Sequence, residues 1–286
     1  MSTIAYTPEF VERGYNNRAA VPDHPRWFTR YAELSAAAVA ALAPQRDLRY
    51  GPGPKETLDL FVPPARARGT FAFIHGGYWR ALDKADFSFV ATPLVAEGYA
   101  VANVNYDLCP DVSIATIVGQ IVRAVTWLAR DGAVHGAVGP LVVGGHSAGG
   151  HLAAMLWTID WALAGFGRAP FVAGLSLSGV HDLAPMVQFS FNADFRLDAA
   201  GAAQLSPARL EPRVDAPLLV AVGGSETSEF LRQARLQWEA WPAQRPAGSA
   251  GPLVLPGKDH FSVVADHADA QSELTRGVLA LFRPRD

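Results

Sequence analysis

Short apolar runs alternate with longer, helix-like segments over most of the chain. The runs are mainly apolar and fall at residues 71–74, 100–106, 141–143, 171–177, 218–222 and 253–255. The segments expected to be helical lie at residues 87–96, 114–129, 151–163, 228–241 and 273–282. Continuous apolar runs are typical of strands buried on both faces. Because a helix between two strands makes them parallel neighbours, the alternation predicts a mostly parallel, doubly wound α/β sheet.

Two parts of the chain depart from this rhythm. Residues 5–42 read as a helical arm that begins near Thr7, where a capping hydroxyl precedes a proline and an acid. Residues 181–213 hold Asn, Asp, Pro and scattered aromatics without a clean strand, and so long a stretch is typical of a small cap over a site. No flexible linker divides the sequence, so we expect residues 1–286 to form one domain.

Composition narrows the function. The chain has 286 residues, 50% hydrophobic and 18% charged, with a formal net charge of −3. This balance gives no electrostatic reason to expect nucleic acid or a membrane as partner. The chain also lacks a signal-peptide pattern at its start and any run of about 18 apolar residues. We therefore expect a cytoplasmic protein with one packed thiol, Cys109, and the sequence leaves a homodimer open.

The pentapeptide Gly145-His146-Ser147-Ala148-Gly149 fits the G-x-S-x-G pattern of a nucleophilic serine. It follows the apolar run 141–143 and precedes a helical segment, which is the context that the motif requires. Its tight turn lifts the serine hydroxyl above the carboxyl edge of the sheet. A glycine-rich turn can also bind phosphate, but neither phosphate-binding glycine pattern occurs in the chain. We therefore assign Ser147 as the nucleophile.

A second glycine motif, His75-Gly76-Gly77-Tyr78-Trp79, directly follows the run 71–74. In α/β-hydrolases the loop after this strand supplies an oxyanion-hole amide. We assign Gly77 and Ala148 as the main amide donors, with Gly76 shaping the loop or donating too. His75 precedes the nucleophile, the wrong order for a base in this fold, so we expect it to hold the loop. Tyr78 and Trp79 fit a pocket wall or the core equally well.

The base should be a histidine late in the chain, after the acid. His260 leaves the last predicted strand at its carboxyl end, where it can reach Ser147. Of the other histidines after the serine, His151 is expected to pack within its helix and His181 to lie at the start of the cap near the pocket. His267 lies in a polar stretch and is expected to be exposed. We assign His260 as the base.

The acid should follow the run 218–222, in a loop that contains no aspartate. Glu226 lies near the apex of the loop, and Glu229 lies in the first turn of the next helix, where an acid is favourable for the helix alone. Asp259 adjoins His260 in sequence, which points the two side chains apart. We assign Glu226, with Glu229 as the alternative.

These residues predict a serine hydrolase that acts on a small molecule. His260 removes a proton as Ser147 attacks an acyl carbon, and Glu226 holds the imidazole in the required tautomer. No histidine, cysteine or carboxylate cluster has metal-ligand spacing, so we expect neither a metal nor another cofactor.

The motifs together resemble those of the kynurenine formamidase (arylformamidase) group of α/β-hydrolases, close to the hormone-sensitive-lipase-like esterases. The resemblance covers nearly the whole chain and is carried by HGGYWR at 75–80, NYDLCP at 105–110, GHSAGGHLAA at 145–154 and DHFSVV at 259–264. It implies hydrolysis of N-formyl-L-kynurenine to L-kynurenine and formate, in tryptophan catabolism. Familiar eukaryotic members carry an aspartate as the acid where this chain offers Glu226.

Such a substrate would need aromatic and polar contacts. Tyr78, Trp79, Trp161 and Phe191 are candidates for an aromatic wall, and a polar clamp could come from Arg18, Asn192 or Arg196. Two alternatives remain open: a carboxylesterase for small aryl or alkyl esters, and a non-catalytic binding protein on a hydrolase scaffold.

Overall fold

A computed structural model describes residues 6–283 of the chain, so residue 5, the expected first residue of the arm, lies outside the described part. Within this part, eight strands form one sheet in the order β1-β2-β4-β3-β5-β6-β7-β8. The strands are β1 (Gln45–Arg49), β2 (Thr57–Phe61), β3 (Thr70–Ile74), β4 (Ala100–Val104), β5 (Leu141–His146), β6 (Ala173–Leu177), β7 (Leu218–Gly223) and β8 (Leu253–Leu255).

Only β2 runs against the direction of the other strands of this sheet. β1 pairs with β2, and β2 with β4, in antiparallel fashion, whereas β4, β3, β5, β6, β7 and β8 run parallel. The predicted mostly parallel, doubly wound sheet is thus confirmed. Strand order reverses between β3 and β5, because β4 continues to one side of β3 and β5 to the other. Open α/β sheets bind ligands at such a switch point.

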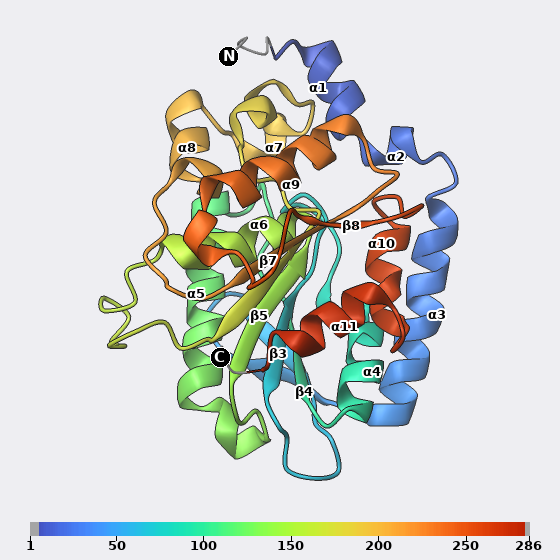
Figure 1. The fold of residues 1–286 in the computed structure, drawn as a ribbon, viewed down its shortest axis with the longest axis vertical. Helices are drawn as coiled ribbons and strands as arrows, with labels where there is room; N and C mark the ends of the chain where they lie inside the picture. The colour runs from blue at the N-terminus through green and yellow to red at the C-terminus, as the bar shows by residue number, and fades with distance from the viewer. Residues whose placement is uncertain (1–5, 284–286) are drawn as a thin grey trace.

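Helices cover both faces of the sheet (Figure 1). The α-helices are α1 (Pro8–Tyr15), α2 (Asn17–Ala20), α3 (Pro25–Leu42), α4 (Ala91–Ala96), α5 (Ile114–Arg130), α6 (Ala148–Met155), α7 (Asn192–Phe195), α8 (Ala199–Gln204), α9 (Ser228–Ala240), α10 (Ser262–Ala265) and α11 (Glu273–Ala280). The 3₁₀ helices are η1 (Lys84–Val90), η2 (Gly132–His135), η3 (Leu156–Thr158), η4 (Ala184–Gln188), η5 (Pro207–Arg209), η6 (Pro242–Gln244) and η7 (Asp266–Ala268). Among the described residues, no helix combines the length and the apolar character that a membrane span requires.

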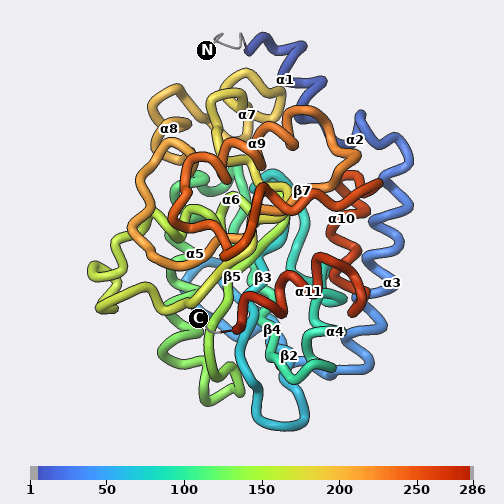
Figure 2. The backbone as a smooth tube through the Cα atoms, viewed as in Figure 1, coloured from blue at the N-terminus to red at the C-terminus, as the bar shows by residue number. Residues whose placement is uncertain are grey.

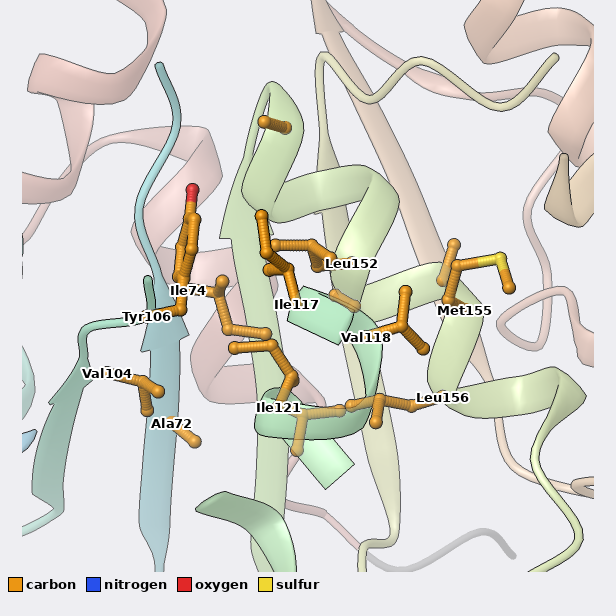
Figure 3. Close-up of a cluster of buried hydrophobic side chains, with 14 of the residues drawn as sticks. Ala72, Ile74, Val104, Tyr106, Ile117, Val118, Ile121, Leu152, Met155 and Leu156 are labelled. Carbon is orange, nitrogen blue, oxygen red and sulfur yellow. The ribbon is translucent and has the colours of Figure 1, made fainter. Parts of the chain in front are cut away.

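Side chains that alternate along each strand divide the core into two layers. On β3, Ala72 and Ile74 join the layer under α5, α6 and α9, while Phe71 and Phe73 join the layer under α3, α4 and α11. Figure 3 shows part of the first layer, where sheet residues such as Ile74 meet side chains from α5 and α6. Burial on both faces explains why these strands are continuously apolar in sequence.

Helices α1 and α2 of the arm lie with the cap at the carboxyl edge of the parallel strands, whereas α3 covers one face of the sheet (Figure 1). The expected cap contains the short helices η4, α7, α8 and η5, and Figure 2 shows α1 of the arm beside α9 and close to α7. Thr7 caps α1 as expected, since its hydroxyl accepts from the N–H of Phe10 at 3.2 Å. The hydroxyl of Thr227, just before α9, donates to the carbonyl of Gly14 at 2.6 Å and ties the arm down.

Candidate active site

The G-x-S-x-G segment forms a sharp turn between β5 and α6. Ser147 has φ 56° and ψ −117°, a conformation that side-chain-bearing residues seldom adopt. The turn requires close backbone approach, because a Cβ atom on Gly149 would lie 2.0 Å from the carbonyl oxygen of Ile74 on β3. The small residues of the motif therefore let the nucleophile turn pack directly against the neighbouring strand, with the serine raised at the sheet edge.

Ser147, His260 and Glu226 form one continuous hydrogen-bonded chain. The Oγ atom of Ser147 lies 3.0 Å from Nε2 of His260, and Nδ1 of His260 lies 2.6 Å from Oε2 of Glu226. A carboxylate accepts hydrogen bonds, so Nδ1 carries the proton and Nε2 is free to accept from the serine hydroxyl. All three side chains are buried, which strengthens these bonds relative to bulk water. The loops after β5, β7 and β8 bring them together.

The second carboxylate oxygen of Glu226, which does not contact His260, also accepts hydrogen bonds. Oε1 accepts from the hydroxyl of Ser178 at 2.5 Å and from the N–H of Gly223 at 2.9 Å. Ser178 follows β6 at the same sheet edge, and the sequence analysis did not identify it. Asp259, beside the base in sequence, instead accepts backbone N–H groups at the start of α10. It does not orient the imidazole.

Glu229 has a different role from Glu226, although only three positions separate them. Its carboxylate accepts from the Tyr15 hydroxyl at 2.9 Å and from the guanidinium of Arg232 at 2.9 Å. The Tyr15 contact joins α9 to the arm, the Arg232 contact lies within α9, and neither involves the imidazole. The geometry therefore selects Glu226, not Glu229, as the partner of the base.

The glycine loop after β3 runs beside the nucleophile. Gly77 has φ +108°, and a Cβ atom there would lie 2.1 Å from the carbonyl oxygen of Ala81. Only glycine tolerates both constraints. A Cβ atom on Gly76 would lie 3.2 Å from the Cβ of Ser147, so this loop is in contact range of the serine. Ala148 opens α6 immediately after the serine, so the glycine loop and the start of α6 both lie next to Ser147.

His75 holds this loop in place. Its ring is fully buried, lies 3.0 Å from the side-chain oxygen of Asn105 through Nε2, and stacks on Tyr106 with ring centroids 4.2 Å apart. Burial lowers the pKa of His75 to about 4, so the ring is neutral at neutral pH. The expectation that His75 is structural agrees with these contacts.

A pocket opens in front of His260, and its wall comes from the arm, the glycine loop and the cap. Its lining residues are Asn16, Asn17, Arg18, Phe28, Tyr31, Gly77, Tyr78, Arg80, Ala81, Leu82, Phe87, His146, Phe191, His260 and Phe261. Tyr78 and Phe191 thus lie in the pocket wall, where the sequence analysis placed them. Arg80 forms an ion pair with Asp194, which links the glycine loop to α7 of the cap.

Two tryptophans that we predicted in this wall lie elsewhere. Trp79 is fully buried, and its indole N–H donates to Nδ1 of His151, whose Nε2 lies 2.8 Å from the carbonyl of Leu205 in the cap. Trp161 packs against Phe171, just before β6. For Trp161, the expected helix over 151–163 explains the error, because α6 ends at residue 155 and η3 ends at residue 158, before Trp161.

Two histidines also differ from expectation. His181 is fully buried, with Nε2 2.8 Å from the Ser176 hydroxyl, and does not line the described pocket. His267 is buried, not exposed, with its ring 5.5 Å from that of Phe73 and 6.3 Å from that of Phe71. Its polar neighbours in sequence concealed a position inside the second core layer, where burial lowers its pKa to about 3.

Of the residues proposed for a polar clamp, only Arg18 lines the pocket. The Asn192 side chain donates to the carbonyls of Val187 and Leu197 and stabilises the cap internally. Arg196 is exposed at the end of α7. The arm residues Asn16 and Asn17 were missed as pocket residues because nothing local in the sequence indicates that they line the same pocket as His260.

The site is built for acyl transfer by a serine. Among residues 6–283, no group of three or more His, Cys, Asp or Glu residues is placed to hold a metal ion. The assembled parts are an oriented serine-histidine-glutamate chain, a glycine loop in contact range of the serine and a pocket partly lined by aromatic rings. Together with the fold, this arrangement defines an α/β-hydrolase.

Comparison with known proteins specifies the family. The family model described as BD-FAE matches residues 58–163 of the chain. Kynurenine formamidase from Salmo salar is 31% identical over 242 residues, covering 82% of this chain and 80% of that protein, and the Danio rerio kynurenine formamidase is 30% identical with 82% and 81% coverage. A solved structure from Silicibacter sp. TM1040, described as a putative thioesterase, superposes on this chain with a TM-score of 0.81 and 34% sequence identity. The superposition covers 92% of this chain and 97% of the solved chain. The chain belongs to the kynurenine formamidase family, as the resemblance implied.

Proposed function

We propose that this chain hydrolyses N-formyl-L-kynurenine to L-kynurenine and formate, with Ser147 as nucleophile, His260 as base and Glu226 as the acid of the triad. The observation that carries the proposal is the continuous contact from Glu226 through His260 to the Ser147 hydroxyl, 2.6 Å and 3.0 Å long. Family membership supports the choice of substrate. With this substrate, the enzyme would act in tryptophan catabolism.

In the first half of the reaction, Nε2 of His260 takes the hydroxyl proton while Oγ of Ser147 attacks the formyl carbon. The developing oxyanion receives hydrogen bonds from the amides of Gly77 and Ala148, with Gly76 next to them. Glu226 stabilises the imidazolium that forms. The imidazolium then donates its proton to the aryl nitrogen as the carbon–nitrogen bond breaks, and L-kynurenine leaves.

In the second half, water attacks the formyl-serine. His260 accepts a proton from this water and returns it to Oγ of Ser147, which releases formate and restores the resting enzyme. The imidazole alternates between base and acid in both halves. The neutral Nδ1–H tautomer that Glu226 enforces is therefore the starting state of each half.

The pocket suits a small acyl group on an aromatic leaving group. The serine is buried with the glycine loop in contact range, and a formyl group is the smallest acyl group that could reach it. Tyr78, Phe28 and Phe191 offer rings to the leaving group. Aromatic side chains of this kind stabilise a bound ring through apolar contact and ring packing.

The direct test compares kcat/KM for N-formyl-L-kynurenine with that for p-nitrophenyl acetate and p-nitrophenyl butyrate, with Ser147→Ala as the blank. We expect the formyl amide to be the preferred substrate and the butyrate to be the poorest. Efficient ester turnover without formamide turnover would refute the proposed substrate while retaining the triad.

A hydrolase of small esters is the second candidate function. It is favoured by the solved structure at 34% identity that is described as a putative thioesterase. The same serine, base and amides would cleave an ester, since only the leaving atom differs. The acyl-length series above separates the two candidates, because an esterase would tolerate acetyl and butyryl groups that a formamidase rejects.

A further inference from the structure

The arm supplies a polar corner of the pocket that the proposed chemistry has not used. Asn17 and Arg18 both line the pocket that His260 lines. The backbone just before them is anchored at two points, because the Tyr78 hydroxyl donates to the carbonyl of Tyr15 at 2.6 Å and Thr227 binds the carbonyl of Gly14. Their position in the wall is therefore defined by contacts outside the arm.

Asn17 has an unused hydrogen-bond donor in this wall. The residue is only 5% exposed, and its side-chain nitrogen Nδ2 is buried without a hydrogen-bond partner among the described residues. Leaving such a donor unpaired is unfavourable unless something else pairs with it. Its neighbour Asn16 differs, since its amide nitrogen donates to Glu12 at 2.7 Å. Because Asn17 lines the pocket, a rotation of its side chain brings this unpaired donor to an acceptor that enters there.

Arg18 brings a positive charge to the same corner. Within residues 6–283 it takes part in no ion pair, and its guanidinium lies 5.6 Å from the ring centroid of Phe28. Arg80, the other arginine of the pocket wall, pairs with Asp194 and is thereby neutralised. Arg18 and Asn17 together present donors and one positive charge, which is the complement of a carboxylate.

A chain of aromatic rings separates this corner from the base. Phe28, beneath Arg18, lies 5.6 Å from the ring of Phe261, and Phe261 lies 5.8 Å from the imidazole of His260. A second anchor holds this wall, because the Tyr31 hydroxyl donates to the carbonyl of Phe261 at 2.5 Å. A ligand that reaches from the serine to the arm would thus present its reacting carbonyl first, an apolar or aromatic part next and an anion last.

We propose that Asn17 and Arg18 form a subsite for the carboxylate of the leaving group and make the enzyme selective for acidic aryl substrates. The inference rests on the proposed function, since an amino-acid-bearing aryl formamide has this order of groups. Arg18 supplies the charge, and Asn17 donates to one carboxylate oxygen. Both act on binding and not on the chemical step, so the subsite should affect KM more than kcat.

The experiment compares N-formyl-L-kynurenine with its α-carboxamide, which has the same shape without the negative charge. Arg18→Gln removes the charge at an exposed position, and Arg18→Lys retains it. Arg13→Gln is the matched control, because Arg13 is an exposed arginine on the same arm outside the pocket wall. We expect Arg18→Gln to lower kcat/KM for the carboxylate about tenfold through KM, with the carboxamide within about twofold of the wild-type value.

Arg18→Lys should recover part of the loss, Arg13→Gln should behave as wild type, and added salt should weaken the wild-type preference for the acid. Equal losses on both substrates, or no loss on either, would overturn the proposal. If the wild type cleaves neither formamide, the proposed function fails separately, and the same variants are then assayed on an aryl acetate bearing a remote carboxylate and on its carboxamide. If Arg18→Gln loses the preference for the acid on this pair of substrates, the subsite is retained. If Arg18→Gln keeps the wild-type preference, the subsite is rejected.

Discussion

The catalytic residues Ser147, Glu226 and His260, which form the floor of the site, are positioned differently from the pocket wall that the arm helps to form. Two glutamates illustrate the difference. Glu226, in the loop after β7, binds the base at the sheet edge, whereas Glu229, one helical turn later, binds Tyr15 of the arm. The floor depends on where parallel strands end, and its backbone is fixed by the sheet. The wall depends on side-chain hydrogen bonds between segments 214 positions apart. Substitutions in the floor should therefore lower kcat, and substitutions in the wall should raise KM.

The largest effect should come from the nucleophile in the floor. Ser147→Ala removes the attacking oxygen, and His260→Ala removes the group that activates it, so each should lower kcat by about 10⁶. Because the two act as a unit, the double variant should be hardly worse than either single one. Steady-state kinetics on purified protein measures this, with circular dichroism as the folding control. Additive losses in the double variant would contradict a single Ser147–His260 unit.

The next effect should come from Glu226→Gln. The amide keeps the shape of the side chain but loses the charge that stabilises the imidazolium, so kcat should fall about 10³- to 10⁴-fold with little change in KM. The matched variant Glu229→Gln makes the same chemical change three residues away. A large kcat loss in Glu229→Gln together with near-normal Glu226→Gln would reverse the assignment of the two glutamates.

Low pH should reduce the free energy of unfolding through His267, which is buried in the core beside Phe71 and Phe73. Burial lowers the pKa of His267 to about 3, below its ordinary value of about 6.5, so the folded protein holds it neutral while the unfolded chain takes up a proton. The stabilisation is complete above about pH 6.5 and is lost as pH falls towards 3. At pH 5 the loss should be about 2 kcal/mol. In His267→Gln, the difference in free energy of unfolding between pH 7 and pH 5 should shrink by this amount. An unchanged difference would contradict the buried, neutral ring.

The smallest effect should come from the wall. Glu229→Gln weakens the bonds to Tyr15 and Arg232, so KM should rise a few-fold while kcat stays within about twofold of wild type, as for an interaction used in binding alone. Limited proteolysis should also cut the arm faster, because it opens more often. An unaltered KM with an unaltered cleavage rate would show that Glu229 does not hold the wall.

The same contrast explains what sequence reasoning could reach. Ser147, His260 and Glu226 were predictable as neighbours because each follows a strand whose carboxyl end meets the others at one sheet edge, and chain order alone distinguishes their roles. Apolar runs also predicted the parallel sheet, since burial on both faces requires them. Family membership and fold are confirmed by the comparisons.

The wall could not be predicted in the same way. Trp79 and Trp161 looked suitable for a pocket by residue type, but their burial depends on where α6 ends and on the partner of an indole N–H. Asn17 begins the short helix α2, which has no sequence pattern of its own, and its place in the pocket wall depends on the contacts of the arm with Tyr78 and Thr227. Ser178 likewise gains its role from a contact 48 positions away.

The most direct test of the account is covalent labelling with a fluorophosphonate, followed by peptide mass spectrometry. The probe captures a serine only when a neighbouring base and an oxyanion hole activate it. We predict one adduct per chain, located on Ser147, formed rapidly in the wild type and in Glu229→Gln, and suppressed in His260→Ala and Glu226→Gln. An unlabelled folded protein, or an adduct on another serine, would contradict the central claim that the β5, β7 and β8 loops assemble a working nucleophile at Ser147.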